Sequence, residues 1–153
     1  MSSFALAEKA AHATPLHAVL QREYKAWLAA RPPLVRAWLE DTRFVPEPGK
    51  FVLLPAPNGK VAGVLAIMAD SADVWSVAHL STVLPAHTYA LTGNIKPALA
   101  TQLALGWALG AYRFTRYKTK ELPPVATLLL PVGADKSYVL AMAEAIYLAR
   151  DLN

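Results

Sequence analysis

The feature that most constrains the fold is an asparagine-glycine pair, Asn58-Gly59, placed between two apolar segments. Both residues tolerate the positive φ that a tight hairpin turn requires, so segments 51–54 and 61–68 are predicted to be antiparallel strands. Segment 61–68 has no polar residue at alternate positions. We therefore expect it to be buried on both faces, as a strand is in a sheet covered by helices.

Other segments complete an α/β pattern. Strands are expected at 87–91 and 125–130, and helices at 16–30, 34–41, 73–83, 97–117 and from 135 to the end of the chain. The first helix rests on Leu16, Val19 and Trp27 at helical spacing, with Thr14 as its N-cap. The fold class predicted is therefore α/β, with a mixed, mostly parallel sheet covered by helices on both faces. All 153 residues are expected to form a single domain.

Composition excludes several classes of protein. With 55% hydrophobic and 17% charged residues the chain is too apolar for disorder, yet it has no apolar run long enough to span a bilayer. The absence of cysteine excludes disulfides, thiolate metal sites and a cysteine nucleophile. Glu8 and Lys9 interrupt the region where a signal peptide needs an apolar stretch. We therefore expect a cytoplasmic protein with no membrane partner.

The helix expected at 97–117 is apolar on more than one side. Leu99, Leu103, Trp107, Gly110 and Phe114 form one face, and Leu105, Leu109 and Tyr112 form a second flank. We expect the first face on the sheet and the second flank exposed as a partner surface. Gly106 and Gly110 lie four apart, which indicates close packing of a neighbouring element.

The net charge of +4 is unevenly distributed, because no acidic residue lies between Asp73 and Glu121. That window holds a group of cations, namely Lys96, Arg113, Arg116, Lys118 and Lys120. They could bind phosphates or nucleic acid. We favour a structural role, in which cations offset the negative end of the long helix, because no nucleic-acid-binding motif accompanies them.

Candidate catalytic and metal-binding residues form no motif. The histidines are His12, His17, His79 and His87, and none belongs to a His-Glu-x-x-His sequence. Asp70 and Asp73 are explained by capping. Ser76 and Ser81 lie near His79 but lack a third group to orient the histidine, and no glycine-rich phosphate loop is present. We therefore assign no catalytic, cofactor-binding or metal-binding residue, and an enzyme acting through the serines is the least favoured hypothesis.

One segment carries a family resemblance. Residues 103–118, Leu-Ala-Leu-Gly-Trp-Ala-Leu-Gly-Ala-Tyr-Arg-Phe-Thr-Arg-Tyr-Lys, resemble the end of the long helix in the N-terminal domain of bacterial leucine (cytosol) aminopeptidases. Segments 60–65, 84–91 and 143–152 are similar to successive parts of the same domain and of the helix that leads out of it. The resemblance covers residues 61–153, and its specific part is Gly-Trp-Ala-Leu-Gly-Ala-Tyr-Arg-Phe.

The resemblance implies a macro-domain-like fold and a non-catalytic role for residues 1–153. In that family the two divalent metal ions (zinc or manganese), their ligands and the catalytic lysine and arginine lie in a C-terminal metallopeptidase domain, expected here after Asn153. The implied partners are that catalytic domain and further copies of the chain, as a hexamer. The alternative hypothesis is a free-standing macro-like module that binds a nucleotide or nucleic acid through the cations between Arg113 and Lys120.

Overall fold

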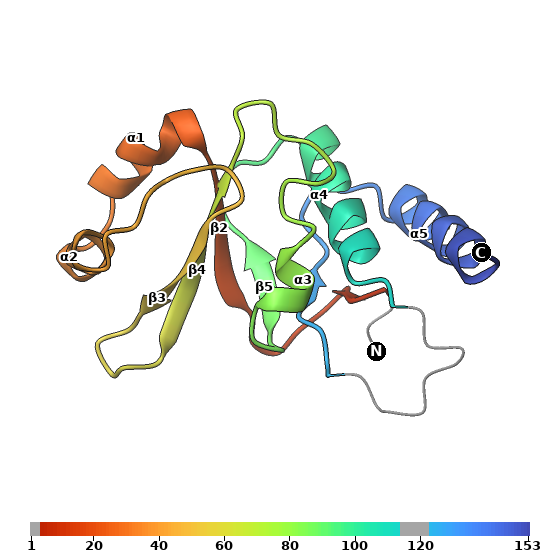
Figure 1. Cartoon of the computed structure of the whole chain (residues 1–153), viewed down its shortest axis with the longest axis horizontal. Helices are drawn as coiled ribbons and strands as arrows, with labels where there is room; N and C mark the ends of the chain where they lie inside the picture. Colours follow the sequence, from red (N-terminus) through yellow and green to blue (C-terminus); the bar gives the residue numbers. More distant parts are fainter. Residues whose placement is uncertain (1–3, 114–122) are drawn as a thin grey trace.

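The computed structural model describes residues 4–113 and 123–153 and contains a twisted sheet between two groups of helices (Figure 1). The strands are β1 (Leu6–Ala7), β2 (Thr14–Leu20), β3 (Phe51–Pro55), β4 (Val61–Met68), β5 (Thr88–Leu91) and β6 (Thr127–Leu129). Their order in the sheet is β1-β6-β5-β2-β4-β3. The β3–β4 pair is antiparallel and the other pairs are parallel, so the prediction of a mixed, mostly parallel sheet is confirmed.

The β3–β4 hairpin forms at the predicted asparagine-glycine turn. Gly59 has a φ of +82°, and Asn58 Oδ1 accepts a hydrogen bond of 3.0 Å from the Lys60 amide. Along β4, the residues from Gly63 to Met68 are buried, and the two that adjoin the turn are exposed. The expectation of a strand covered on both faces is thus confirmed for the part of β4 that lies inside the sheet.

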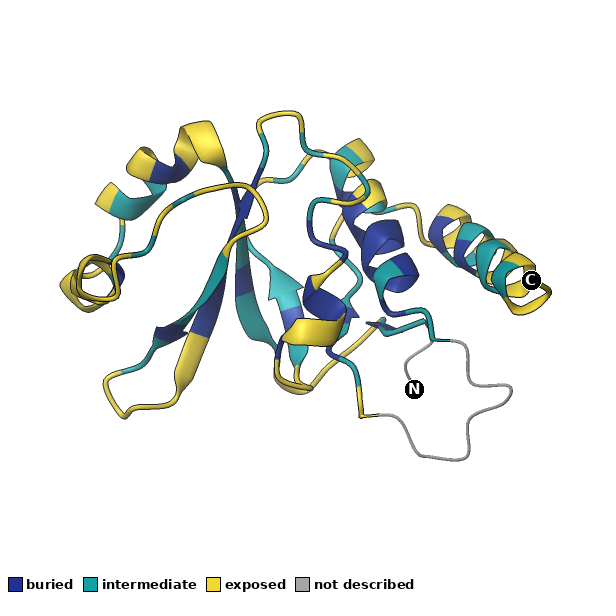
Figure 2. Cartoon of the chain, viewed as in Figure 1, coloured by how far each residue is buried: buried dark blue, intermediate teal, exposed yellow. Residues whose placement is uncertain are grey.

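Helices cover both faces of the sheet, as predicted. A 3-10 helix, η1 (Gln21–Glu23), leads into α1 (Tyr24–Ala29) and α2 (Pro33–Asp41) on one face. On the other face lie α3 (Leu80–Val83), α4 (Pro97–Gly110) and α5 (Lys136–Asp151). Each face has its own apolar core, one around Val19, Tyr24 and Leu39 and a larger one around Leu16 and Trp107. Figure 2 shows the burial concentrated on β4 and α4, where the layers meet.

The prediction of a helix at 16–30 is wrong for its first half. Residues 14–20 form β2, which pairs with β4 on one side and β5 on the other, and helical structure begins only at Gln21. Leu16 is buried in the α4 core and Val19 in the core beneath α1. Because both faces are covered, apolar residues three apart along a strand imitate helical spacing.

The helix expected at 73–83 is also mostly wrong. Only Leu80–Val83 is helical, and the residues before it form turns. Those turns lie against α4, as the glycine pair indicated: a Cβ on Gly106 would lie 1.5 Å from the Val74 carbonyl oxygen, and one on Gly110 1.9 Å from that of Ala78. The predicted close packing is therefore confirmed, and its partner is backbone rather than a helix face.

The α4 helix is internal to the domain. It ends at Gly110 rather than near residue 117, and Phe114 lies outside the described residues. Leu105 and Leu109, expected on an exposed partner surface, are only 8% and 6% exposed, because α5 and the turns before α3 pack around α4. Tyr112, the third residue of that flank, is half-buried and donates a hydrogen bond to Asp151 of α5, so the expectation of a partner surface on this helix is wrong. None of the helices in residues 4–113 and 123–153 combines the length and the hydropathy that a membrane-spanning helix requires.

The C-terminal elements agree closely with the prediction. β6 occupies the centre of the predicted strand, and α5 begins after Asp135, whose Oδ1 accepts a hydrogen bond of 3.0 Å from the Tyr138 amide. Val139 and Ala143 of α5 are fully buried against α4. The phenol of Tyr147 donates to the Ala108 carbonyl at 2.6 Å.

Candidate functional site

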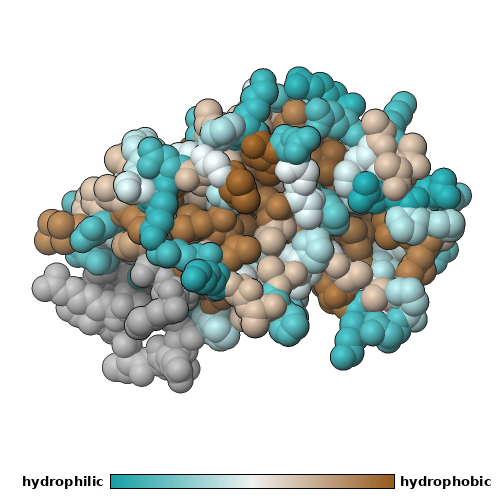
Figure 3. All heavy atoms as spheres, turned by 180° about the vertical axis from the view of Figure 1, so that it is seen from behind, coloured by the Kyte–Doolittle hydropathy of each residue, from teal (hydrophilic) through white to brown (hydrophobic). Residues whose placement is uncertain are grey.

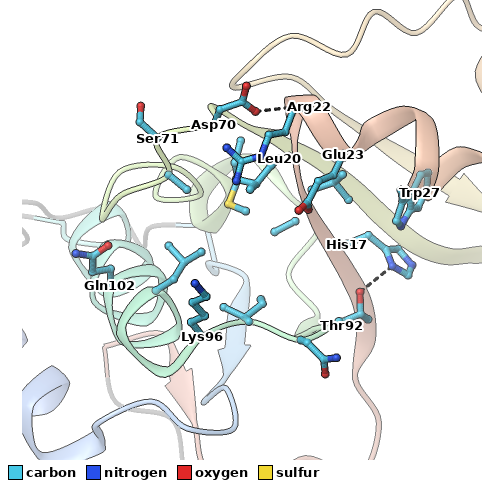
Figure 4. A pocket seen from close by; sticks show the side chains of 18 of the residues that line it. His17, Leu20, Arg22, Glu23, Trp27, Asp70, Ser71, Thr92, Lys96 and Gln102 are labelled. Carbon is cyan, nitrogen blue, oxygen red and sulfur yellow. Dashed lines mark hydrogen bonds between the residues drawn. The ribbon is translucent and has the colours of Figure 1, made fainter.

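A cleft of about 1020 Å³ opens at the carboxyl ends of β2, β4 and β5 (Figure 4). The segment that follows each of these strands contributes to its lining, together with the first turns of α4. β2 is the central strand here, and the chain leaves it toward β4 and later returns to β5 on its other side. In open α/β sheets, ligands bind outside the carboxyl ends of the strands where the strand order reverses in this way. The cleft is therefore the candidate ligand site of the domain.

The cleft has an apolar floor and a rim of mixed charge. Leu20, Met68 and Leu99 belong to its floor and walls, while Arg22, Glu23, Asp70 and Lys96 supply two cations and two anions. Asp70 Oδ1 accepts a hydrogen bond of 2.8 Å from the Arg22 amide, which ties the loop after β4 to the start of η1. Because the opposite charges balance, the rim does not favour a polyanion.

His17 lies in the wall of the cleft, on β2. Its Nδ1 is 2.8 Å from the Thr92 hydroxyl, and its ring centroid is 5.4 Å from that of Trp27. Burial of the imidazole, helped by the nearby Arg31 guanidinium, lowers the pKa of His17. The histidine is thus neutral at pH 7 and joins β2 to the loop after β5 as a hydrogen-bonding residue.

This lowered pKa predicts a loss of stability in mild acid. Below pH 6.5, the ordinary pKa of histidine, the unfolded chain binds a proton that folded His17 resists, so the free energy of unfolding should fall as the pH drops toward the folded pKa. In the His17→Gln variant, this part of the pH dependence should disappear. Urea denaturation at pH 7.5 and 5.5 measures both proteins, and an equal loss of stability in the two would contradict the assignment.

The serines and histidine considered as a catalytic group have separate backbone partners. Ser76 Oγ accepts a hydrogen bond of 2.9 Å from the Asp73 amide, and buried Ser81 donates to the Ala78 carbonyl at 3.0 Å. His79 Nε2 lies 3.0 Å from the Gly49 carbonyl oxygen. The structure does not bring the three together as a nucleophile and its base.

The two aspartates cap backbone segments. Asp73 Oδ1 accepts a hydrogen bond of 2.9 Å from the Trp75 amide, so it caps a turn and not the start of a helix as predicted, whereas Asp70 accepts from the distant amide of Arg22. Of the other histidines, His12 is exposed and His87 stacks on Tyr89. Across residues 4–113 and 123–153, no three histidine, aspartate or glutamate side chains are placed to hold a metal ion.

The described cations of the predicted patch lie at opposite ends of α4. Lys96 is the N-cap residue, beside the cleft, and Arg113 follows the end of the helix and donates to the Pro123 carbonyl. A helix of this length separates its ends by about 20 Å. Arg116, Lys118 and Lys120 lie outside the described residues. Lys96 therefore belongs to the cleft and not to a surface shared with Arg113.

Comparison with known proteins gives a consistent result. The sequence model of one protein family, the N-terminal domain of M17 aminopeptidases, matches residues 14–131. The crystal structure of cytosol aminopeptidase from Coxiella burnetii is 27% identical, with a TM-score of 0.87 over 98% of this chain and 33% of that chain. No curated protein sequence matches the chain.

A second solved relative has the same fold. The bottromycin maturation enzyme BotP is 25% identical, with a TM-score of 0.59 over 92% of this chain and 32% of that one. Its complex with Mn is 23% identical, with a TM-score of 0.58 over the same shares. The chain thus spans about a third of the length of the solved structures that it matches.

Proposed function

The chain belongs to the family of M17 aminopeptidase N-terminal domains, and from this premise we propose that it is the non-catalytic domain of a leucyl aminopeptidase-like metallo-exopeptidase. The observation that carries the proposal is the superposition of 98% of the chain on one third of the Coxiella cytosol aminopeptidase. Its role is to pack against the catalytic domain of the same polypeptide and to support assembly of the oligomer, a hexamer. Such a protein acts in the cytoplasm.

In this proposal the metal centre belongs to the other part of the polypeptide. The histidine and carboxylate side chains described here are not clustered as ligands, so they do not fit a site for two divalent ions. BotP has been solved in complex with Mn, which supports zinc or manganese as the metal of the full-length enzyme. Residues 1–153 would then position the catalytic domain and support assembly of the oligomer, and they would carry out no step of peptide hydrolysis.

The alternative is a free-standing module that binds a nucleotide or nucleic acid through the cations between Arg113 and Lys120, of which the structure describes only Arg113. The cleft is a second surface on which such a ligand could bind. Its rim carries Glu23 and Asp70 beside Arg22 and Lys96, and repulsion by the carboxylates opposes a phosphate chain. Arg113 donates a hydrogen bond to the Pro123 carbonyl, and the other predicted cations, Arg116, Lys118 and Lys120, lie outside the described residues. The charges of the cleft therefore oppose phosphate binding at that site, which supports the aminopeptidase domain.

The test compares residues 1–153 alone with a fusion that also contains a catalytic domain. We expect residues 1–153 alone to hydrolyse no aminoacyl-p-nitroanilide and to bind no stoichiometric Zn²⁺ or Mn²⁺, because the catalytic and ligand residues lie elsewhere. A fusion in which residues 1–153 replace the matching third of the Coxiella enzyme should form an oligomer and hydrolyse leucine-p-nitroanilide with added metal. The remaining two thirds of that enzyme, expressed without an N-terminal domain, serve as the control.

Two results would contradict the proposal. Metal-dependent hydrolysis by residues 1–153 that survives repurification would show that the domain is itself catalytic. A fusion that is no more active or stable than the truncated control would show that this chain cannot act as the N-terminal domain of an aminopeptidase.

A further inference from the structure

The cleft at the carboxyl ends of β2, β4 and β5 carries opposite charges on its two sides. Glu23 is the last residue of η1 on one side, and Lys96 precedes α4 on the other. Both side chains extend into the space between these elements (Figure 4). Arg22 and Asp70 lie together on the side of Glu23 and offset each other in charge. The cleft is therefore acidic on the η1 side and basic on the α4 side.

The charges of Glu23 and Lys96 are available to a ligand. Both residues are exposed, and within residues 4–113 and 123–153 neither forms an ion pair. Between them lies an apolar surface to which Leu20, Met68 and Leu99 contribute. Seen from behind, apolar side chains lie in the middle of the molecular surface, and hydrophilic side chains border them (Figure 3). A ligand complementary to the cleft has a positive end, a negative end and an apolar part.

The start of α4 adds to the basic side of the cleft. Lys96 is the N-cap residue and makes no side-chain capping hydrogen bond, and Pro97, the first residue of the helix, has no N–H. The first amides of the helix therefore belong to Ala98 and Leu99, and both residues line the cleft. Helix amides and an adjacent ammonium together favour a carboxylate.

We infer that the cleft binds a short zwitterionic peptide with apolar side chains. The N-terminal ammonium of the peptide pairs with Glu23, its C-terminal carboxylate lies at Lys96 and the first amides of α4, and its side chains pack on the apolar floor. The inference goes beyond the proposed function and does not depend on it, because residues of this chain alone form the cleft.

The size of the cleft favours a peptide over a single amino acid. Its volume is about 1020 Å³, and clefts that enclose a drug-sized ligand have volumes of about 300 to 1000 Å³. A single amino acid would leave most of that space to water, whereas a peptide of about two to four residues is a ligand of this size. Asn94 and Gln102 also line the cleft. Their amide groups can donate hydrogen bonds to peptide bonds and accept hydrogen bonds from them.

The same charges disfavour other ligands of similar size. A nucleotide would bring several negative charges close to Glu23 and Asp70, which repel them. A fatty acid would leave Glu23 without a partner, and an apolar amine would leave Lys96 without one. A zwitterion satisfies both ends of the cleft together.

Peptides with blocked ends test the inference. The purified chain is titrated in amide NMR spectra with the tripeptide Leu-Ala-Leu, with its N-acetylated form, which lacks the ammonium, and with its C-terminal amide, which lacks the carboxylate. We expect the unmodified tripeptide to shift the amide signals of Ala98 and Leu99 and to bind with a Kd below about 1 mM. Each blocked form, free leucine and ADP should bind at least fivefold more weakly.

Two substitutions that remove one charge each assign the ends of the site. Glu23→Gln should weaken binding of Leu-Ala-Leu at least fivefold and leave binding of the acetylated form unchanged. Lys96→Gln should likewise weaken binding of Leu-Ala-Leu and leave binding of the amide form unchanged. Such pairwise coupling does not arise from a general change of structure. Glu40→Gln and Lys60→Gln, at exposed positions outside the cleft, are the matched controls and should leave every affinity unchanged.

Four results would overturn the inference. These are equal affinity for the three forms of the tripeptide, no shift of the cleft signals at about 10 mM tripeptide, tighter binding of free leucine, and tighter binding of ADP. The third result would indicate an amino acid site and the fourth a phosphate site. None of the four bears on the proposed function, which the fusion with the Coxiella enzyme tests separately.

Discussion

Gly106→Ala is expected to destabilise the domain by at least about 3 kcal/mol, although alanine is the better helix former by about 1 kcal/mol. The new Cβ would lie 1.5 Å from the carbonyl oxygen of Val74 and 2.7 Å from its carbonyl carbon. These are backbone atoms and cannot rotate away, so α4 and the turns at 74–78 must separate. Separation opens a gap in the core next to Trp107, where contacts are lost on both sides.

Urea denaturation of the purified chain measures this loss. Gln102→Ala, on the exposed side of the same helix, is the matched control and should change the free energy of unfolding by less than about 0.5 kcal/mol. Gly110→Ala, with its Cβ 1.9 Å from the Ala78 carbonyl oxygen, should cost less than Gly106→Ala, because the last residue of a helix shifts more easily. Unchanged stability in Gly106→Ala would mean that the turns do not pack on α4 as described.

The glycine pair illustrates which parts of the fold were predictable from sequence. Its spacing indicated close packing, and the structure confirms it, because removal of side chains from one strip of a helix has few other uses. The turn at Asn58-Gly59 and the cap at Asp135 were predictable for the same reason. Each is a local requirement of the backbone that only a few residue types satisfy.

β2 could not be assigned correctly by such local signals. Leu16 and Val19 contact different cores on opposite faces of the sheet, so their spacing carries no information about the period of the strand. When residues 14–20 are predicted as a helix, the central strand of the sheet is missing. The position of the carboxyl ends of the strands then cannot be predicted. The cleft was therefore missed, although its lining includes the Thr92-Gly93-Asn94 turn, which reads in sequence as a loop between a strand and a helix.

The cleft also depends on tertiary structure that no single segment contains. Arg22, Asp70 and Lys96 come from the segments that follow β2, β4 and β5, which are far apart in the sequence and meet only because these strands are neighbours. The family resemblance, in contrast, was visible because it is carried by the continuous sequence around α4. That sequence is specific because α4 contacts the sheet, α5 and the turns before α3, and so must satisfy several packing constraints together.

Trp107→Ala is expected to cost about 3 to 5 kcal/mol, a large part of the stability of a domain of this size. Trp107 is fully buried, its ring lies 6.3 Å from that of Tyr89, and its Nε1 donates a hydrogen bond of 3.1 Å to the Ala126 carbonyl next to β6. Alanine would leave a cavity between α4 and the sheet and an unpaired buried carbonyl. Trp107→Phe keeps most of the volume and should cost clearly less, which separates the cavity from the hydrogen bond.

Leu105→Ser tests whether the second flank of α4 is buried or exposed. If the flank of Leu105 and Leu109 were an exposed surface, as the sequence suggested, the substitution would leave the thermal midpoint unchanged. Leu105 is instead part of the same buried cluster as Trp107, so replacing it with a hydroxyl should cost about 2 to 4 kcal/mol. Thermal and urea unfolding of the three variants should therefore rank both Trp107→Ala and Leu105→Ser as severe. A silent Leu105→Ser beside a severe Trp107→Ala would show that α5 does not cover this side of α4.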